Sequence, residues 1–206
     1  MTTTKNELET HPYQPFIPKN ATKLIIGSIP PQRFCVLKNG EKVLETKDVD
    51  FYYGSKDNSF WRLVGAVFNI SLEEANTNTA VEQRKQVLAE NGMGITDIVA
   101  SCQRKEDNSS DENLDIIERK DLRKLLSDNP QIDTLIYTSD FIKKQVNVYF
   151  KTYHSTIPTA KKEFTLKIDT KIYKVKILFS PSPNALRNMG QGGSERRQQQ
   201  YREFLA

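Results

Sequence analysis

The sequence predicts an α/β fold in which helices flank a central, mostly parallel sheet. Short apolar runs, typical of buried parallel strands, occur at residues 23–27 (KLIIG) and 134–138 (TLIYT). Segments with helical character lie between and after these runs, and strands that alternate with helices favour parallel pairing. The 206 residues suit one domain, and no repeat or linker divides residues 1–206.

The N-terminal part of the chain predicts an arm and a hairpin. Residues 1–22 are polar and contain three prolines, which exclude a helix and predict an extended arm laid over the domain. Residues 34–46 alternate in polarity on both sides of Asn39-Gly40, a pair that favours a tight two-residue turn. We therefore expect residues 34–46 to form a hairpin inserted after the first strand.

An aromatic loop follows at residues 50–61, which read DFYYGSKDNSFW. Gly54 can adopt backbone angles that other residues avoid, so the stretch predicts a turn between two aromatic groups. A helix is expected over residues 59–68, with Asp57 or Asn58 as its N-cap. Aromatic rings can stack on a flat base, and a carboxamide can hold a water. The alternative is an ordinary buried aromatic cluster beside a capped helix.

The remaining elements follow from periodicity and capping signals. Residues 93–99 predict a loop or short strand, and residues 101–113 predict a polar loop without apolar periodicity. Further helices are expected at residues 71–91, 114–126, 139–153 and 194–205. Two alternating strands are expected at residues 163–168 and 171–180, joined at Asp169-Thr170.

The composition excludes several classes of protein. No run of about 18 apolar residues is present, so no membrane span is expected. Two cysteines are too few for a disulfide framework or an iron–sulfur cluster, and two histidines disfavour a catalytic zinc site, so we expect no metal or cofactor. The N-terminus lacks a signal pattern, which predicts a cytoplasmic protein, nucleoid-associated if bacterial. The net charge of +4 permits binding to a polyanion without requiring it.

Three loops are expected to meet at one edge of the sheet. They are GSIPPQRF, DFYYGSKDNSFW and SPSPNALRN, and the first and last directly follow predicted core strands. Ligands of open α/β sheets bind outside the carboxyl ends of the strands. The sequence therefore predicts a binding site where these loops converge.

In their order, the segments GSIPP, YYGSKDNSFW, NGMGITDIVASCQR and SPSPNALR resemble the uracil-DNA glycosylase superfamily. The resemblance is greatest to its mismatch-specific uracil and hypoxanthine-DNA glycosylase branches and runs from His11 to Arg187. It implies a three-layer sandwich with a four-stranded sheet, and hydrolysis of the bond between a damaged base and deoxyribose without a metal. The implied partner is DNA containing a deaminated or mismatched base, which is flipped out of the duplex. We expect the protein to be a monomer.

The resemblance assigns a base pocket. Gly27, Ser28 and Ile29 match the motif that lies beneath the flipped nucleotide, and Tyr53 matches the stacking aromatic residue. Ile29 replaces the usual water-activating Asp or Asn. Asn58 in the NSFW segment matches the residue implicated instead in the hypoxanthine branch, although it can also be only a helix cap. Two further residues, Asp97 and Ser101, either support the pocket or cap a turn.

A second motif, residues 180–187, matches the loop that enters the minor groove in the superfamily. It gives DNA-binding candidates at Ser180, Pro181, Ser182, Pro183, Asn184 and Arg187. Ser180 stands where the classical uracil enzymes have a histidine, so no imidazole is present there to stabilise the leaving base. The alternative is a proline-stiffened surface loop. Three arginines of the last helix are expected to form a solvated face rather than a DNA contact: Arg196, Arg197 and Arg202.

Two functions remain open from the sequence. The first is a monofunctional DNA glycosylase acting on uracil or hypoxanthine in base-excision repair, which Tyr53 and Asn58 favour. The second is a protein of the same fold that binds nucleic acid or a nucleotide without cleaving it, which Ile29 and Ser180 favour.

Overall fold

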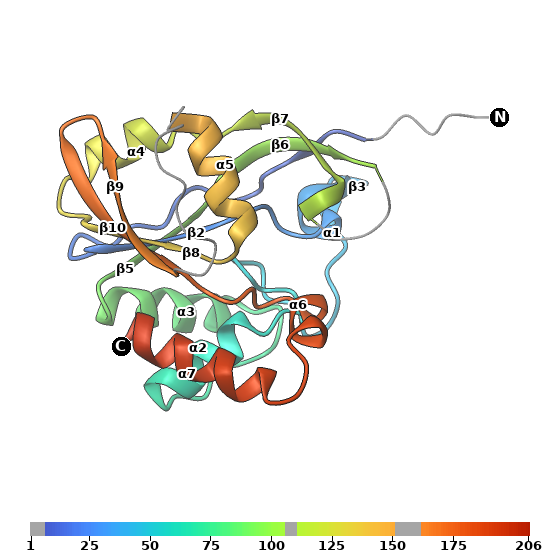
Figure 1. Cartoon of the computed structure of the whole chain (residues 1–206). Coiled ribbons are helices and arrows are strands. Elements are labelled where there is room, and N and C mark those ends of the chain that lie inside the picture. Colours follow the sequence, from blue (N-terminus) through green and yellow to red (C-terminus); the bar gives the residue numbers. More distant parts are fainter. Residues whose placement is uncertain (1–6, 106–110, 151–161) are drawn as a thin grey trace.

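The computed structural model describes residues 7–105, 111–150 and 162–206, and its centre is a five-stranded sheet (Figure 1). In spatial order the strands are β5 (Met93–Asp97), β2 (Lys23–Gly27), β8 (Thr134–Tyr137), β10 (Lys171–Ile177) and β9 (Glu163–Ile168). The first four run parallel, and β9 pairs antiparallel with β10 at the edge. The mostly parallel sheet is thus confirmed, with β9 as a fifth strand added to the four implied by the resemblance.

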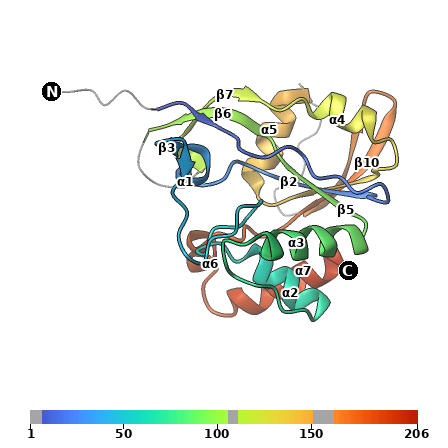
Figure 2. The same cartoon turned by 180° about the vertical axis from the view of Figure 1, so that it is seen from behind.

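Helices cover both faces of this sheet, as the opposite views in Figures 1 and 2 show. One face carries α2 (Phe60–Phe68), α3 (Asn78–Glu90) and α7 (Gly193–Leu205), and the other α4 (Leu122–Asp128) and α5 (Asp140–Phe150). Alternation along β2 divides the core: Ile25 packs toward α2, α3 and α7, whereas Leu24 and Ile26 pack toward α4 and α5. Since both faces are buried, the strand reads as a continuous apolar run.

A second, three-stranded sheet corrects two predictions. It contains β1 (Glu9–Thr10), β6 (Val99–Arg104) and β7 (Leu114–Arg119), all paired antiparallel. The predicted polar loop at 101–113 therefore begins as strand, and the predicted helix at 114–126 is wrong over its first half. Ile116 and Ile117 are β-branched and favour extended backbone, and the α4 helix starts only where the Asp121 side chain accepts a hydrogen bond from Lys124 N (2.9 Å).

Residues 7–22, the described part of the predicted arm, run along the edge of the molecule. His11 N donates to Ala100 O (2.8 Å), and Phe16 forms an isolated bridge with Ile95 of β5. The Glu9 carboxylate is fully buried and pairs with Arg104 of β6 at 2.9 Å. The arm therefore lies against the edge of β5 at Phe16 and is tied to β6 by main-chain and ionic contacts.

The predicted hairpin segment, residues 34–46, contains a shorter hairpin of β3 (Leu37–Lys38) and β4 (Glu41–Lys42). Its turn residues Asn39 and Gly40 have φ of 54° and 86°, as a type I′ turn requires. The short helix α1 (Gln32–Cys35) precedes it.

Two predicted boundaries move in the structure, and a third lies outside the described residues. Helix α3 begins at Asn78 instead of residue 71, because the Thr77 hydroxyl caps it by accepting from Ala80 N (3.1 Å). The strand predicted to reach residue 180 ends at Ile177, and α6 (Pro183–Asn188) follows the loop. Helix α5 ends at Phe150, and the remainder of the predicted helix lies outside the described residues.

The aromatic loop is largely buried, as its alternative interpretation predicted. Four of its rings are 0 to 5% exposed: Phe51, Tyr52, Phe60 and Trp61. Trp61 Nε1 donates to Tyr52 O (2.7 Å), which ties the helix α2 back to the loop. Only Tyr53 among these aromatics is partly exposed.

Gly54 allows the backbone of this loop to close on itself. A Cβ placed on Gly54 would lie 1.7 Å from Val49 O, and Gly54 O accepts from Val49 N (2.7 Å). We expect Gly54→Ala to lower the free energy of unfolding in urea by about 2 kcal/mol or more, because backbone must move. Gly40→Ala is the matched control, since nothing lies within 4 Å of its Cβ position; its positive φ should cost about 1 kcal/mol. Equal losses for both variants would contradict the close approach at Gly54.

Candidate nucleic-acid interface and base pocket

The carboxyl ends of β2 and β5 bring Gly27 and Asp97 side by side, since the two residues are paired in the sheet. A Cβ placed on Gly27 would lie 2.1 Å from both Asp97 Oδ1 and the Tyr53 hydroxyl. Only glycine fits here, because the two polar groups occupy the space that a side chain would take. Three residues predicted to contact the base therefore meet at one point.

Tyr53 is held in a defined position at this point. Its φ of 55° is left-handed, an uncommon conformation for a bulky residue that often marks functional sites. Its ring stacks on Phe60 at a centroid distance of 4.4 Å, and its hydroxyl donates to Thr138 Oγ1 (2.7 Å) at the end of β8. Burial raises the pKa of Tyr53 well above its usual value, so the phenol stays neutral.

A buried polar cluster that the sequence did not predict supports Asp97. Its Oδ2 lies 2.8 Å from His11 Nε2, and the two side chains are 6% and 1% exposed. Lys120 Nζ lies 3.0 Å from His11 Nδ1 and donates to Tyr13 O (2.9 Å). Burial lowers the pKa of Lys120 to about 8. The arm thus supplies an imidazole that fixes the orientation of the Asp97 carboxyl group.

Ser28 and Ile29 present backbone donors next to Gly27. The carbonyls of Gly27 and Ser28 accept from Ile98 N (2.8 Å) and Val99 N (3.1 Å), which fixes the turn. Within the described ranges, the amides of Ser28 and Ile29 donate to no backbone carbonyl. The Ile29 side chain packs against the core on the α4 and α5 side, so it cannot bind a water.

Asp111 adds a carboxyl group near Ser28. It begins a 3-10 helix (Asp111–Asn113) in the segment that was predicted to be a polar loop. Burial raises its pKa to about 6, and the Ser28 hydroxyl and the charge of Arg104 oppose this shift only in part. A carboxyl group with a raised pKa that bonds to Ser28, next to the end of β2, is a candidate for a functional role.

Asn58 lies one residue before Ser59, which is the N-cap of α2, so the prediction of Asp57 or Asn58 as the N-cap is wrong. The Asn58 Oδ1 still accepts from Phe60 N (2.9 Å), the first N–H of the helix, and its backbone N donates to Ser55 O (2.9 Å). The side chain is half-buried, and no partner of its Nδ2 lies among the described residues. The amide therefore supports the start of the helix and keeps hydrogen-bonding capacity for a water.

The second predicted loop docks directly beside Asn58. The neighbouring Ser59 donates to Pro181 O from its backbone N (3.1 Å) and from its hydroxyl (2.6 Å). The hydroxyl of Ser182 caps α6 by accepting from Ala185 N (3.2 Å), and Ser180 Oγ accepts from Ser182 N (3.3 Å). The structure thus brings the NSFW segment and the SPSP segment together.

The outer end of this loop is exposed. Pro183 is the first residue of α6, and Asn184 and Arg187 lie on its solvent side, where the Arg187 guanidinium donates to the Asn184 carboxamide. A neutral carboxamide does not neutralise the arginine, so its charge remains open to a phosphate.

Helix α7 contacts the same loop, which corrects the prediction that its three arginines form a solvated face. Arg197 is 4% exposed rather than solvated, and its guanidinium donates to Ser180 O (3.2 Å) and Ser182 O (3.4 Å). The Gln200 carboxamide accepts from Phe179 N (2.5 Å) and donates to Ile177 O (3.2 Å). Arg196 and Arg202 are exposed.

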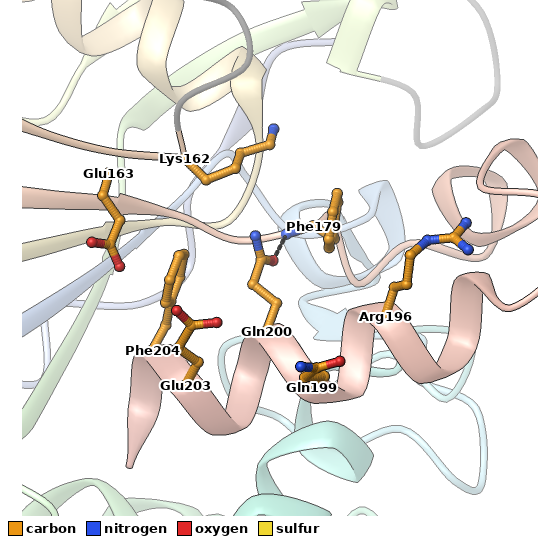
Figure 3. A pocket seen from close by; sticks show the side chains of 8 residues that line it. All are labelled: Lys162, Glu163, Phe179, Arg196, Gln199, Gln200, Glu203 and Phe204. Atoms are coloured by element: carbon orange, nitrogen blue, oxygen red, sulfur yellow. Dashed lines mark hydrogen bonds between the residues drawn. The ribbon is translucent and has the colours of Figure 1, made fainter.

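A shallow pocket of about 600 Å³ lies beside this support (Figure 3). In the close-up Gln200 bonds to Phe179 at its centre, with Lys162 and Glu163 on one side and Arg196 on the other. None of the predicted site residues lines it. The side chains that line it carry charges of both signs, and of these residues Phe179 directly precedes the predicted loop at Ser180. We therefore assign the candidate site to the convergent loops instead.

Two broader features concern metals and membranes. Over residues 7–105, 111–150 and 162–206, no group of three or more His, Cys, Asp or Glu side chains is arranged to hold a metal ion. In the same residues, no helix has both the length and the apolar character needed to cross a bilayer.

The fold has a counterpart among solved structures. No family model and no curated protein matches the sequence, whereas twelve chains of solved structures match the fold. One is the solution NMR structure of "a putative Uracil DNA glycosylase" from Methanosarcina acetivorans, with a TM-score of 0.60 and 19% sequence identity over 96% of this chain and 98% of that chain. At this identity the similarity shows the fold, so the predicted uracil-DNA glycosylase-like three-layer architecture is confirmed.

Proposed function

We propose that the protein is a monomeric, metal-independent DNA glycosylase that hydrolyses the N-glycosidic bond of uracil or hypoxanthine in DNA. The observation that carries this proposal is the convergence of Gly27, Tyr53 and Asp97 at the strand ends, with the NSFW and SPSP loops joined by the Ser59–Pro181 contact. The similarity to a structure that carries the name of a uracil DNA glycosylase supports it. In base-excision repair the protein would act where the DNA is, in the cytoplasm and on the nucleoid of a bacterium.

The chemistry needs few groups. The glycosidic bond breaks through a cationic sugar, and the base leaves as an anion. The amides of Ser28 and Ile29, which donate to no backbone carbonyl of the described residues, would stabilise that anion as donors placed where charge develops. Asn58 would orient the water that captures the sugar, which requires no strong base once the cation has formed.

The pocket would read the flipped base through Tyr53 and Asp97. Tyr53 would stack on the base, and the Asp97 carboxyl group, oriented by His11, would contact its edge. Ser182 and Arg187 would contact the backbone phosphates on either side of the flipped nucleotide.

One observation favours the second function, binding without cleavage. The Tyr53 hydroxyl and Asp97 Oδ1 fill the space over Gly27, so a base can enter this point only if these groups move. Release of free base from a panel of deaminated-base oligonucleotides, measured as abasic sites, distinguishes the two functions.

Asn58→Ala should lower the rate of base excision by about 10²–10³-fold, by analogy with the loss of other well-placed polar groups in active sites. DNA affinity should change little, because the effect is confined to the transition state. Asn58→Asp is the control, since a carboxylate can accept the same hydrogen bond from Phe60 N and folding should survive. Excision by Asn58→Ala at the parent rate would leave Asn58 with only this local role at the start of α2.

Arg187→Ala should weaken DNA binding by a similar factor for every sequence tested, because a phosphate contact carries no base information. The slope of log affinity against log salt should fall by about 1. Binding titrations at several salt concentrations measure both quantities. Arg202→Ala removes an exposed arginine from α7 and should leave the slope unchanged. An equal effect of the two variants would argue against a specific contact between Arg187 and the DNA backbone.

Asp111→Asn should stabilise the protein at neutral and alkaline pH. The pKa of Asp111 is raised in the folded state, so its ionisation costs stability as pH rises from about 4 through about 6. The amide variant avoids this cost, and its free energy of unfolding at pH 8 should exceed that of the parent by about 1 kcal/mol. Urea unfolding at pH 4 should show a smaller gain. A gain that does not depend on pH would contradict burial of the carboxylate.

A further inference from the structure

A second pocket, of about 590 Å³, lies along α2 and the loop that follows it. Its lining includes Gly65 and Ala66 of this helix, and Asn69 and Ser71 of the loop. None of the residues predicted for the strand-end site or for the DNA-binding loop lines it. The pocket is therefore a different site from the one formed by the convergent loops.

Arg84 is a buried cation in the wall of this pocket. Its side chain comes from α3 and is only 2% exposed. One guanidinium nitrogen donates to Glu73 O (2.9 Å) and Ala80 O (2.8 Å), and the group lies 5.4 Å from the centre of the Trp61 ring. Its Nε is buried and has no hydrogen-bond partner in the part of the chain that the structure describes. An unsatisfied buried N–H on a charged group is costly, so this donor calls for an explanation.

The charge of the pocket is not neutralised by direct pairing. Arg62 also lines it, and among the described residues neither Arg62 nor Arg84 has a carboxylate oxygen within 4.0 Å. Glu73 and Glu74 favour the charged form of Arg84 only from a distance, and Glu74 shares the pocket lining. Burial lowers the pKa of Arg84 to about 10, which keeps the guanidinium charged at neutral pH.

We propose that this pocket binds a small oxyanion, a phosphate or a carboxylate group, with Arg84 as its main contact. A guanidinium binds planar or tetrahedral oxyanions through charge-assisted hydrogen bonds, and it does so most strongly where water is excluded. Arg62 adds a second positive charge, and Asn69 and Ser71 supply uncharged donors from the loop.

Trp61 makes the proposal directly measurable. It is the single tryptophan of the chain and lies against Arg84. Titration of the parent protein with sodium phosphate, and separately with sodium acetate, at ionic strength held constant with sodium chloride should give a saturable change in tryptophan fluorescence for at least one anion. The two titrations identify which oxyanion the pocket prefers. A fluorescence signal that stays flat for both anions would overturn the proposal.

Three variants assign the binding to the pocket. Arg84→Gln should weaken the affinity by about 10-fold or more, in line with the loss of a hydrogen bond to a charged group. Lys85→Gln, at the adjacent, partly exposed residue of α3, should bind like the parent. Arg84 also donates to the Glu73 carbonyl, so Arg84→Gln can fail to fold. In that case the anion affinity of Arg62→Gln tests the assignment. Unchanged affinity in the variants that fold would overturn it. Base excision by Arg62→Gln should equal that of the parent, which separates this site from the proposed function.

Discussion

The missing side chain at Gly27 is the constraint on which the candidate site depends. Because nothing projects from the end of β2, Tyr53 from one loop and Asp97 from β5 can approach the same point. Tyr53 reaches it with a left-handed backbone and a hydroxyl held by Thr138, and Asp97 reaches it with a carboxyl group held by His11. Side chains from four separate segments are therefore positioned around the Cα of Gly27: His11, Tyr53, Asp97 and Thr138.

The predicted DNA-binding loop is fixed in a different way, through its carbonyl groups. Pro181 O accepts from Ser59 on one side, and Ser180 O and Ser182 O accept from Arg197 on the other. This arrangement satisfies the main chain of a proline-rich segment that cannot form regular pairs. It leaves the outward-facing side chains, above all Arg187, available for a partner.

Local patterns predicted the central sheet but not the second sheet. The strand at β2 is buried on both faces, so its continuous apolar run has one straightforward interpretation. Strand β7 alternates only weakly, with Ile117 at 57% exposure, and its sequence also fits an amphipathic helix. The β-branched Ile116 and Ile117 favour a strand, but the pairing with β6 decides between strand and helix, and a local pattern does not show that pairing.

The sequence predicted the residues of the candidate site that belong to a local motif, but not those that come from distant parts of the chain. Gly27, Tyr53, Asn58 and the SPSP segment were found from local sequence, whereas His11 and Lys120 were not. Likewise, Arg197 lies on the same helix as Arg196 and Arg202, and only its position facing the loop makes it buried. Such roles depend on tertiary contacts that no spacing rule encodes.

The contact between His11 and Asp97 also sets when the site can form during synthesis. The two residues are separated by 86 positions, and Lys120 lies a further stretch along the chain, 109 positions from His11. The arm is synthesised before β5 and before the segment after β7, so its imidazole has partners only once both of these have been made. Contacts of such long sequence separation form slowly, since the loop between them must close first. The candidate site is therefore expected to assemble late, after the central strands have paired, so a chain that ends before β5 would have the arm without the candidate site.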